Sequence, residues 1–245
     1  MPRRMRQLSN SGYMHLIIRG VAQQILFEDR EDYQFFLSLL ERFCQETEIK
    51  MIAYCLMDNH VHLLILDRNR NTSLFMKKLE VTYAKYYNEK YERAGHLFQN
   101  RYHNINIDNE RSLLAVFRYI LNNPVKAGIC SASLYKWSSY RLYGSKDSFV
   151  DTSEICTLLG DFQLMDSFLN EKNEDGSMDD RPARHNDDWG KEILVKTLNI
   201  NNGAVLKEYS RKDRDKSLRI LKDAGLSTRQ IERLTGISKS VVQRA

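Results

Sequence analysis

The chain has 245 residues, of which 42% are hydrophobic, and its 37 Lys and Arg exceed its 32 Asp and Glu, for a net charge of +5. This length allows one well-buried core and a smaller second domain. No apolar run reaches the roughly 20 residues of a membrane span, and the basic N-terminus lacks the apolar stretch of a secretory signal. We therefore expect a cytoplasmic protein with no membrane partner. The four cysteines are widely spaced without a CxxC motif, which argues against a zinc cluster or a disulfide framework.

The first half of the chain alternates between the apolar patterns of strands and helices. In chain order we predict strands over 13–20, 50–57, 60–66 and 102–107, and helices over 29–47, 73–91 and 109–122. Asp58 and Asn59 form the tight turn of an antiparallel hairpin, and Asp108 caps the third helix. This order predicts an α+β fold, with a ferredoxin-like (split βαβ) antiparallel sheet and helices on one face.

The most informative motif lies in the third strand, where His60 and His62 are separated by one apolar residue. Side chains alternate along a strand, so both imidazoles lie on the same face. Paired imidazoles on a rigid strand can form half of a metal site. Without further context, such histidines are more often half-buried structural residues.

A second motif lies near the end of the third helix. Tyr119 and Asn123 are four residues apart, which places them one turn apart on the same helix face. Pro124 limits how far this helix continues unbroken. Two imidazoles, a phenol and an amide oxygen together suit the cleavage of a phosphodiester bond. With all four present, metal binding is favoured over a structural role for the two histidines. His15, His96 and His103 are weaker candidates.

The remainder of the chain changes character twice. Residues 131–160 are rich in turns, with the segment 137–140 (WSSY) as an anchor on the core. Residues 161–188 are acidic and polar, and we predict that they form a flexible linker. Residues 189–245 hold 13 Lys and Arg against 6 Asp and Glu. Three parts follow: a first domain over 1–160, the linker, and a basic second domain over 189–245 that suits nucleic acid.

The last 20 residues predict two short helices joined by a turn at Gly236, a helix-turn-helix pattern. Ser227 and Ser238 would cap the two helices. The shared core would consist of Ile231, Leu234, Ile237 and Val241. Because the second helix of this motif enters the major groove, four polar side chains would face DNA: Lys239, Ser240, Gln243 and Arg244. An ordinary helical hairpin is the alternative, and the basic charge favours DNA binding.

Five segments, in their order along the chain, resemble the IS200-like single-tyrosine transposases, and among these most closely the REP-associated tyrosine transposases: HLIIRG, LMDNHVHLLI, YAKYYNEKYERAGHLFQNRY, RYILNNPVKAGI and KWSSY. The resemblance covers residues 1–143 and implies an HUH single-strand DNA endonuclease fold. It also implies His60, His62 and Asn123 as metal ligands and Tyr119 as the nucleophile. Asp58 stands where many relatives carry a proline or a glutamate, and we interpret it as a turn residue.

Two imidazoles and one amide leave open positions on a hard divalent ion, which favours Mg²⁺ or Mn²⁺. The resemblance implies attack by Tyr119 to give a 5′-phosphotyrosine and a free 3′-OH, followed by joining of strands. The expected partner is single-stranded DNA that contains a hairpin, with duplex DNA at the second domain, and both a monomer and a homodimer stay open. Phosphate contacts are expected from exposed cations: Arg3, Arg4, Arg6, Arg19, Arg93, Arg101 and Lys126.

Two other functions remain open. The first is a DNA-binding regulator whose catalytic core is vestigial, although all four site positions hold residue types that are competent for the reaction. The second is an RNA-binding module, but the strands lack its characteristic aromatic motif. Metal-dependent nicking of single-stranded DNA would separate the enzyme from both alternatives.

Overall fold

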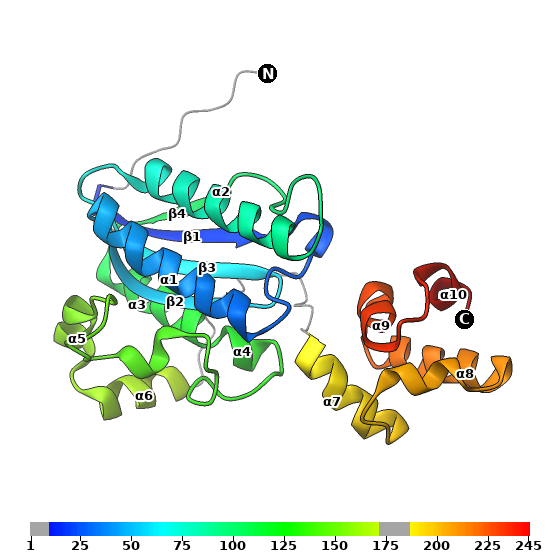
Figure 1. Cartoon of the computed structure of the whole chain (residues 1–245). Coiled ribbons are helices and arrows are strands. Elements are labelled where there is room, and N and C mark those ends of the chain that lie inside the picture. Colours follow the sequence, from blue (N-terminus) through cyan, green and yellow to red (C-terminus); the bar gives the residue numbers. More distant parts are fainter. Residues whose placement is uncertain (1–9, 172–186) are drawn as a thin grey trace. The chain divides into compact units, whose positions relative to one another are not determined.

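Figure 1 shows the computed structural model of the chain, which describes residues 10–171 and 187–245. The described residues form two compact units: the first contains 10–26 and 30–171, and the second contains 27–29 and 187–245. In these two described stretches, every helix is too short or too polar to cross a membrane.

The first unit is built on a four-stranded antiparallel sheet. Its strands are β1 (Tyr13–Arg19), β2 (Lys50–Met57), β3 (His60–Leu66) and β4 (His103–Ile107). Their order in the sheet is β2-β3-β1-β4, so β3 lies between β1 and β2 and pairs with both. The predicted α+β class and antiparallel sheet are confirmed, and the strand bounds agree with the prediction to within one residue.

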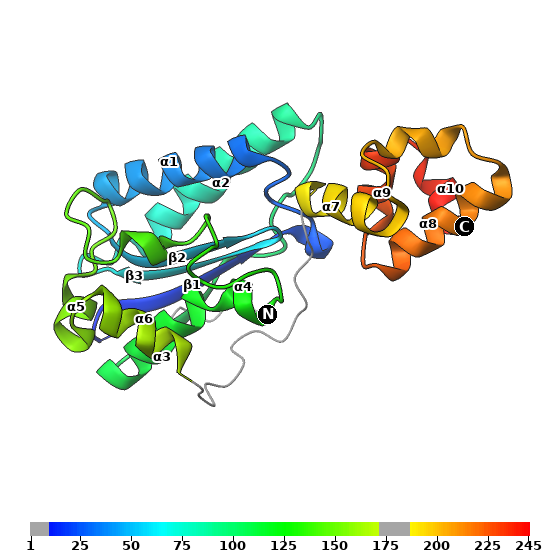
Figure 2. The same cartoon turned by 90° about the horizontal axis from the view of Figure 1, so that it is seen from below.

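Helices cover both faces of this sheet, so the prediction of helices on one face is wrong. Helices α1 (Arg30–Thr47) and α2 (Thr72–Lys90) lie on one face, and α3 (Glu110–Leu121) lies on the other (Figure 2). The physical reason is that β3 is buried at every residue and β2 at all but its first. Both faces of these strands are therefore shielded from solvent, as in a sheet that is covered by helices on both sides.

Helix α3 begins one residue later than predicted and ends at a kink. Its N-cap is Asn109, not Asp108, because the extended backbone of Asn109 lets its side chain accept a hydrogen bond from the Ser112 N–H (2.8 Å). The chain leaves the helix at Asn122, and a short helix α4 (Asn123–Lys126) follows with Pro124 in its first turn, where a proline is tolerated.

Two further helices, α5 (Ser153–Leu159) and α6 (Phe162–Asn170), follow the turn-rich segment. The predicted linker over 161–188 is therefore wrong for its first ten residues, where α6 buries Met165 and Leu169 in the same hydrophobic cluster as α3. Its apolar residues recur at helical spacing, and the acidic run that follows them obscured this pattern. Residues 172–186 of the predicted linker lie outside the described residues.

The second unit is entirely helical in its described residues. It contains α7 (Asp187–Leu198), α8 (Arg211–Asp223), α9 (Thr228–Thr235) and α10 (Lys239–Arg244). Short 3-10 turns complete the described fold: Val21–Gln23 and Ser139–Leu142 in the first unit and Gly203–Lys207 in the second. The core of the second unit is formed by buried side chains from these elements, among them Leu194, Leu206, Leu218, Leu221, Ile231, Ile237 and Val242.

The connection between α9 and α10 follows most of the sequence prediction. Ser227 caps α9 in a reciprocal capping box with Gln230, and Gly236 has the left-handed backbone (φ 65°) that ends the helix. Ser238 occupies the N-cap position of α10 without a side-chain capping bond. The Glu232 carboxylate instead accepts a hydrogen bond from the Lys239 N–H (2.7 Å). Val242 is fully buried, whereas the predicted core residue Val241 is only half-buried.

Candidate active site

Antiparallel pairing brings the histidine motif of β3 beside β1. Arg19 pairs with His60 and Ile17 pairs with His62, so these four side chains share one face of the sheet. The His60 and His62 rings are perpendicular, with their centroids 4.9 Å apart. Both imidazoles are buried, and their positions are fixed because β3 is an interior strand of the sheet.

Helix α3 supplies the phenol. Tyr119 lies in its last two turns, and its ring stands edge-on to His62 with a centroid distance of 5.5 Å. The same ring lies 5.8 Å from that of His15 on β1. Only 2% of Tyr119 is exposed. The structure therefore brings together the predicted nucleophile and the predicted ligand pair, although they are more than 50 residues apart in the chain.

The amide of Asn123 is tied to the backbone at Tyr119. Its Nδ2 donates a hydrogen bond to the Tyr119 carbonyl oxygen (2.9 Å), which preserves the expected one-turn spacing although the helix breaks at Asn122. The side chain is 93% buried. This bond uses the amide nitrogen Nδ2. The other polar atom of the side chain is Oδ1, and an amide oxygen is a suitable ligand for a hard metal ion.

The imidazole nitrogens have distinct partners. His60 Nδ1 is 2.7 Å from Asn59 Oδ1, and His62 Nδ1 is 2.9 Å from His15 Nε2. The other nitrogen of His62, Nε2, is buried and has no hydrogen-bond partner among the described residues. A buried polar atom in this state is unusual, and a metal ion would satisfy it, so the residues fit a divalent ion.

The candidate metal ligands combine imidazole nitrogens with an amide oxygen. Within residues 10–171 and 187–245, no three His, Cys, Asp or Glu side chains converge in a metal-binding arrangement. An ion at this position would have two imidazoles and the Asn123 amide as protein ligands. Its remaining positions would need oxygen atoms from water or from the substrate, which is common for Mg²⁺ and leaves the site open for catalysis.

Burial and the surrounding charges favour a neutral imidazole at His62. Burial lowers the pKa of His62 well below its usual range, and the nearby His60 and His15 rings and the cations Arg19 and Lys126 lower it further. A histidine must be neutral to bind a metal. Lys126 is exposed, and its ammonium Nζ lies over the ring of Tyr119, 4.3 Å from the centroid. Lys126 and Arg19, both predicted phosphate contacts, thus lie near the candidate nucleophile.

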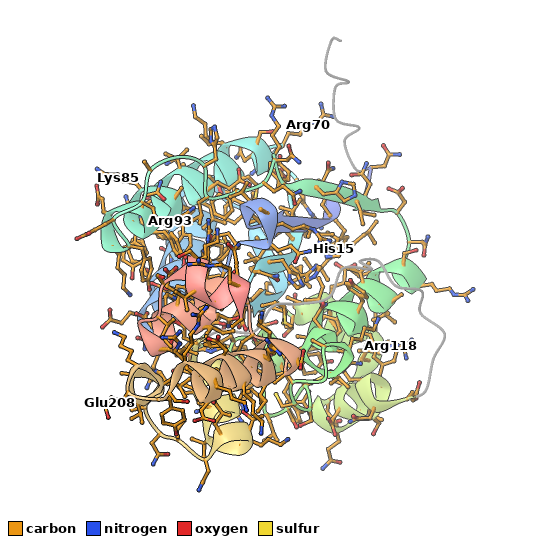
Figure 3. The ribbon with its side chains drawn as sticks, turned by 90° about the vertical axis from the view of Figure 1, so that its right-hand side faces the viewer. His15, Arg70, Lys85, Arg93, Arg118 and Glu208 are labelled. Atoms are coloured by element: carbon orange, nitrogen blue, oxygen red, sulfur yellow. The ribbon has the colours of Figure 1, made fainter. Side chains whose placement is uncertain are left out.

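The other predicted DNA contacts are dispersed. The guanidinium of Arg93 lies over the Tyr87 ring, 5.5 Å from its centroid, and Arg93 is apart from His15 in Figure 3. Arg101 is exposed before β4. In the second unit, four predicted DNA-facing side chains are exposed on α10: Lys239, Ser240, Gln243 and Arg244. The predicted contacts Arg3, Arg4 and Arg6 lie outside the described residues.

Sequence reasoning undervalued two residues of this site. His15 was a weaker candidate and Asn59 was only a turn residue, yet each bonds the Nδ1 atom of one histidine of the motif. The available signal was the segment HLIIRG, which begins with His15. When β1 and β3 pair with Ile17 opposite His62, His15 lies on the same face of the sheet as His62. The sequence alone does not contain that register.

Comparison with known proteins points to one family. Residues 9–123 match the family described as "Transposase IS200 like". A REP-associated tyrosine transposase solved bound to a REP hairpin is similar over 62% of this chain and 94% of that chain, with 15% sequence identity and a TM-score of 0.52. This likeness shows a shared fold. A candidate transposase from Deinococcus radiodurans covers 49% of this chain and 97% of its own, at 19% identity and a TM-score of 0.35. No curated protein matches the chain.

Proposed function

We propose, because residues 9–123 match the IS200-like transposase family, that the chain is a transposase of this family and that it nicks and rejoins single-stranded DNA with Tyr119 as the nucleophile. The observation that carries this proposal is the edge contact of 5.5 Å between the rings of Tyr119 and His62. It places a phenol beside a buried imidazole nitrogen that lacks a partner among the described residues. A nucleophile next to a group that can hold a Lewis-acidic metal ion is an arrangement that suits phosphoryl transfer.

The reaction is a transfer of one phosphodiester. The phenolic oxygen of Tyr119 attacks the phosphorus, a Tyr–O–P bond forms, and the bond from phosphorus to the upstream 3′ oxygen breaks. The phenol loses its proton during the attack, and the departing 3′ oxygen gains one to become a free 3′-OH. The phosphotyrosine keeps the bond energy, so a second 3′-OH can attack it and release the Tyr119 phenol. Strands are thus joined without hydrolysis.

His60, His62 and the Oδ1 atom of Asn123 are the proposed ligands of a divalent ion, Mg²⁺ or Mn²⁺. When bound, such an ion supplies Lewis acidity to the phosphoryl oxygens and offsets the charge that develops on them. Lys126 and Arg19 add fixed positive charge on the same side of the sheet. Asn123 also anchors the end of α3, because its amide donates to the Tyr119 carbonyl oxygen.

We further propose that the substrate contains a DNA hairpin and that the second unit is a helix-turn-helix module that binds duplex DNA. The hairpin bound to the structural relative supports the first part. The capping box, the left-handed Gly236 and the exposed polar face of α10 support the second. The strand order also supports the ferredoxin-like interpretation of the first unit.

The test is the formation of a covalent protein–DNA adduct. The purified full chain is incubated with labelled single-stranded oligonucleotides, including hairpins from the flanks of its own gene, with Mn²⁺, Mg²⁺ or a chelator. We expect an adduct on denaturing gels that requires metal and is lost in Tyr119→Phe. Tyr102→Phe is the matched control, because it also removes one phenolic hydroxyl. The Oη atom of Tyr102 lies 3.4 Å from Ser73 Oγ and has no role in the proposed reaction. This control should form the adduct normally.

A second result would favour the other candidate function. Tight hairpin binding without an adduct, under every metal and across a broad hairpin panel, would overturn the enzymatic proposal. It would instead support a DNA-binding regulator whose catalytic core is vestigial. An adduct that persists in Tyr119→Phe would overturn the choice of nucleophile.

A further inference from the structure

His15 is a third histidine beside the motif, and no role in the proposed reaction accounts for it. It pairs with Leu64 across the sheet, so it is the diagonal neighbour of His62 on the same face. Its Nε2 is 2.9 Å from His62 Nδ1, and its side chain is fully buried. We propose that His15 is a positioning residue that holds the His62 ring with its proton on Nδ1, which leaves Nε2 as the nitrogen for the metal. This inference rests on the proposed function.

The direction of the hydrogen bond follows from the proposed metal site. One of the two facing nitrogens must carry the proton. His62 Nε2 and His15 Nδ1 are both buried atoms without a hydrogen-bond partner among the described residues, so either direction leaves one buried N–H without such an acceptor, at a comparable cost. Only with His62 Nδ1 as the donor and His15 Nε2 as the acceptor does His62 Nε2 have the lone pair that a metal requires.

The neighbouring histidine has an analogous arrangement with a different partner. Asn59 Oδ1 lies 2.7 Å from His60 Nδ1, and an amide oxygen only accepts hydrogen bonds, so His60 also carries its proton on Nδ1. Both histidines of the motif thus have the same tautomer. Partners of this kind orient a metal-binding imidazole, and their removal typically weakens metal binding by about 10- to 100-fold.

The fold explains why His15 can have this role. β1 is an interior strand that pairs with both β3 and β4, so its side chains are held in register from two sides. A register shift of one residue would move His15 to the opposite face of the sheet. The ring of His15 also contacts Tyr119, at 5.8 Å between centroids.

The direct measurement is the tautomer of His62 in the metal-free full chain. Long-range ¹H–¹⁵N correlation spectra of the ¹⁵N-histidine-labelled protein, recorded above neutral pH, distinguish a protonated ring nitrogen from an unprotonated one. The signals of His62 are assigned by their loss in His62→Ala. We expect His62 with a protonated Nδ1 and an unprotonated Nε2. A protonated Nε2 on His62 would overturn the proposal, and no variant of His15 needs to fold for this result.

The second measurement is the affinity of His15 variants for Mn²⁺, determined by calorimetry in the absence of DNA. His15→Phe keeps an aromatic ring but removes the acceptor, and we expect about 10- to 100-fold weaker binding. His15→Gln supplies an amide oxygen at a similar reach, and it should restore most of the affinity. His103→Phe, at an exposed position on β4, is the control and should bind as the unsubstituted chain does.

The outcomes distinguish this proposal from the function on which it rests. Equal Mn²⁺ affinity in His15→Phe and the unsubstituted chain would overturn the role of His15, even if the Tyr119 adduct forms normally. Weak affinity in both His15→Phe and His15→Gln would also overturn it, because a general packing defect would then explain the loss. If the unsubstituted chain neither binds metal nor forms an adduct, the proposed function fails, and this inference fails with it.

Discussion

Lys126 is an exposed residue that contacts buried Tyr119, the proposed nucleophile. Its ammonium lies 4.3 Å from the centroid of the Tyr119 ring, and the residue itself is exposed. A cation at this distance attracts the face of the ring, and in the proposed reaction it would stabilise the negative charge that develops on the phenolic oxygen. Because the same ammonium can approach a phosphate, Lys126 would contact both the substrate and the proposed nucleophile.

We predict that Lys126→Met slows adduct formation about tenfold at saturating DNA and metal, which corresponds to about 1.4 kcal/mol in the barrier. The methionine keeps the length of the side chain and removes only the charge. Saturating DNA removes any effect on binding from the measurement, which is the single-turnover rate of adduct formation. Lys126→Arg keeps the charge and should retain most of the rate. An unchanged rate in Lys126→Met would show that the charge acts only in DNA binding.

At the scale of elements, α6 packs against α3, the helix that carries the proposed nucleophile. Arg118 and Asn122, which flank Tyr119 in the sequence, donate hydrogen bonds to the carbonyl oxygens of Phe168 (3.2 Å) and Leu169 (2.8 Å). The guanidinium of Arg118 also lies over the Phe168 ring, 4.1 Å from its centroid. Met165 of the same helix is fully buried in the cluster that contains Tyr119. The segment thus belongs to the structural support of the site.

We predict that Met165→Ala lowers the free energy of unfolding by about 2–5 kcal/mol, because it leaves a cavity between α6 and α3. Leu164→Ala is the matched control in the same helix: Leu164 is 58% exposed, so we expect a change within about 0.5 kcal/mol. Urea denaturation, followed by circular dichroism, measures both. Equal stability of the two variants would mean that α6 is not part of the core, as the linker prediction had assumed.

The elements that could be predicted from the sequence are those with a strong local pattern. The bounds of β2 and β3 agree with the prediction because β-formers flank a clear turn at Asp58 and Asn59. α6 was missed because its short apolar pattern precedes an acidic run. The hydrogen bond between His15 and His62 could not be predicted because it depends on which residues of β1 and β3 face each other, and local sequence does not determine strand register. The prediction of helices on one face overlooked that β2 and β3 are mainly apolar on both faces, so that α3 can cover the second face.

At the scale of the whole molecule, the described residues form two compact units, and the proposed function assigns a different task to each. The candidate active site lies wholly within the first unit. The second unit contributes a basic composition and the exposed polar side chains of α10. The two units can therefore be tested by substitutions that leave each other's chemistry intact.

We predict that the double substitution Lys239→Ala and Arg244→Ala weakens binding to duplex DNA and reduces the slope of log affinity against log salt by about 1 for each lost phosphate contact. Fluorescence anisotropy over a range of salt concentrations measures this effect. Adduct formation on a short single-stranded oligonucleotide should not change. Lys196→Ala, at an exposed position on α7, is the control. Unchanged duplex affinity in the double variant would argue against α10 as the DNA-reading helix.

The burial of Tyr119 has a consequence for the timing of the reaction. With 2% of its surface exposed, the phenol cannot touch a passing DNA strand until the side chains that cover it, Lys126 among them, move aside. The proposed nucleophile is therefore latent in the resting protein. Single-stranded DNA is common wherever a genome is copied or repaired, and a permanently exposed nucleophile would cut it indiscriminately. Under the proposed function, only a DNA that binds tightly enough to displace the covering side chains would reach the phenol and be cleaved.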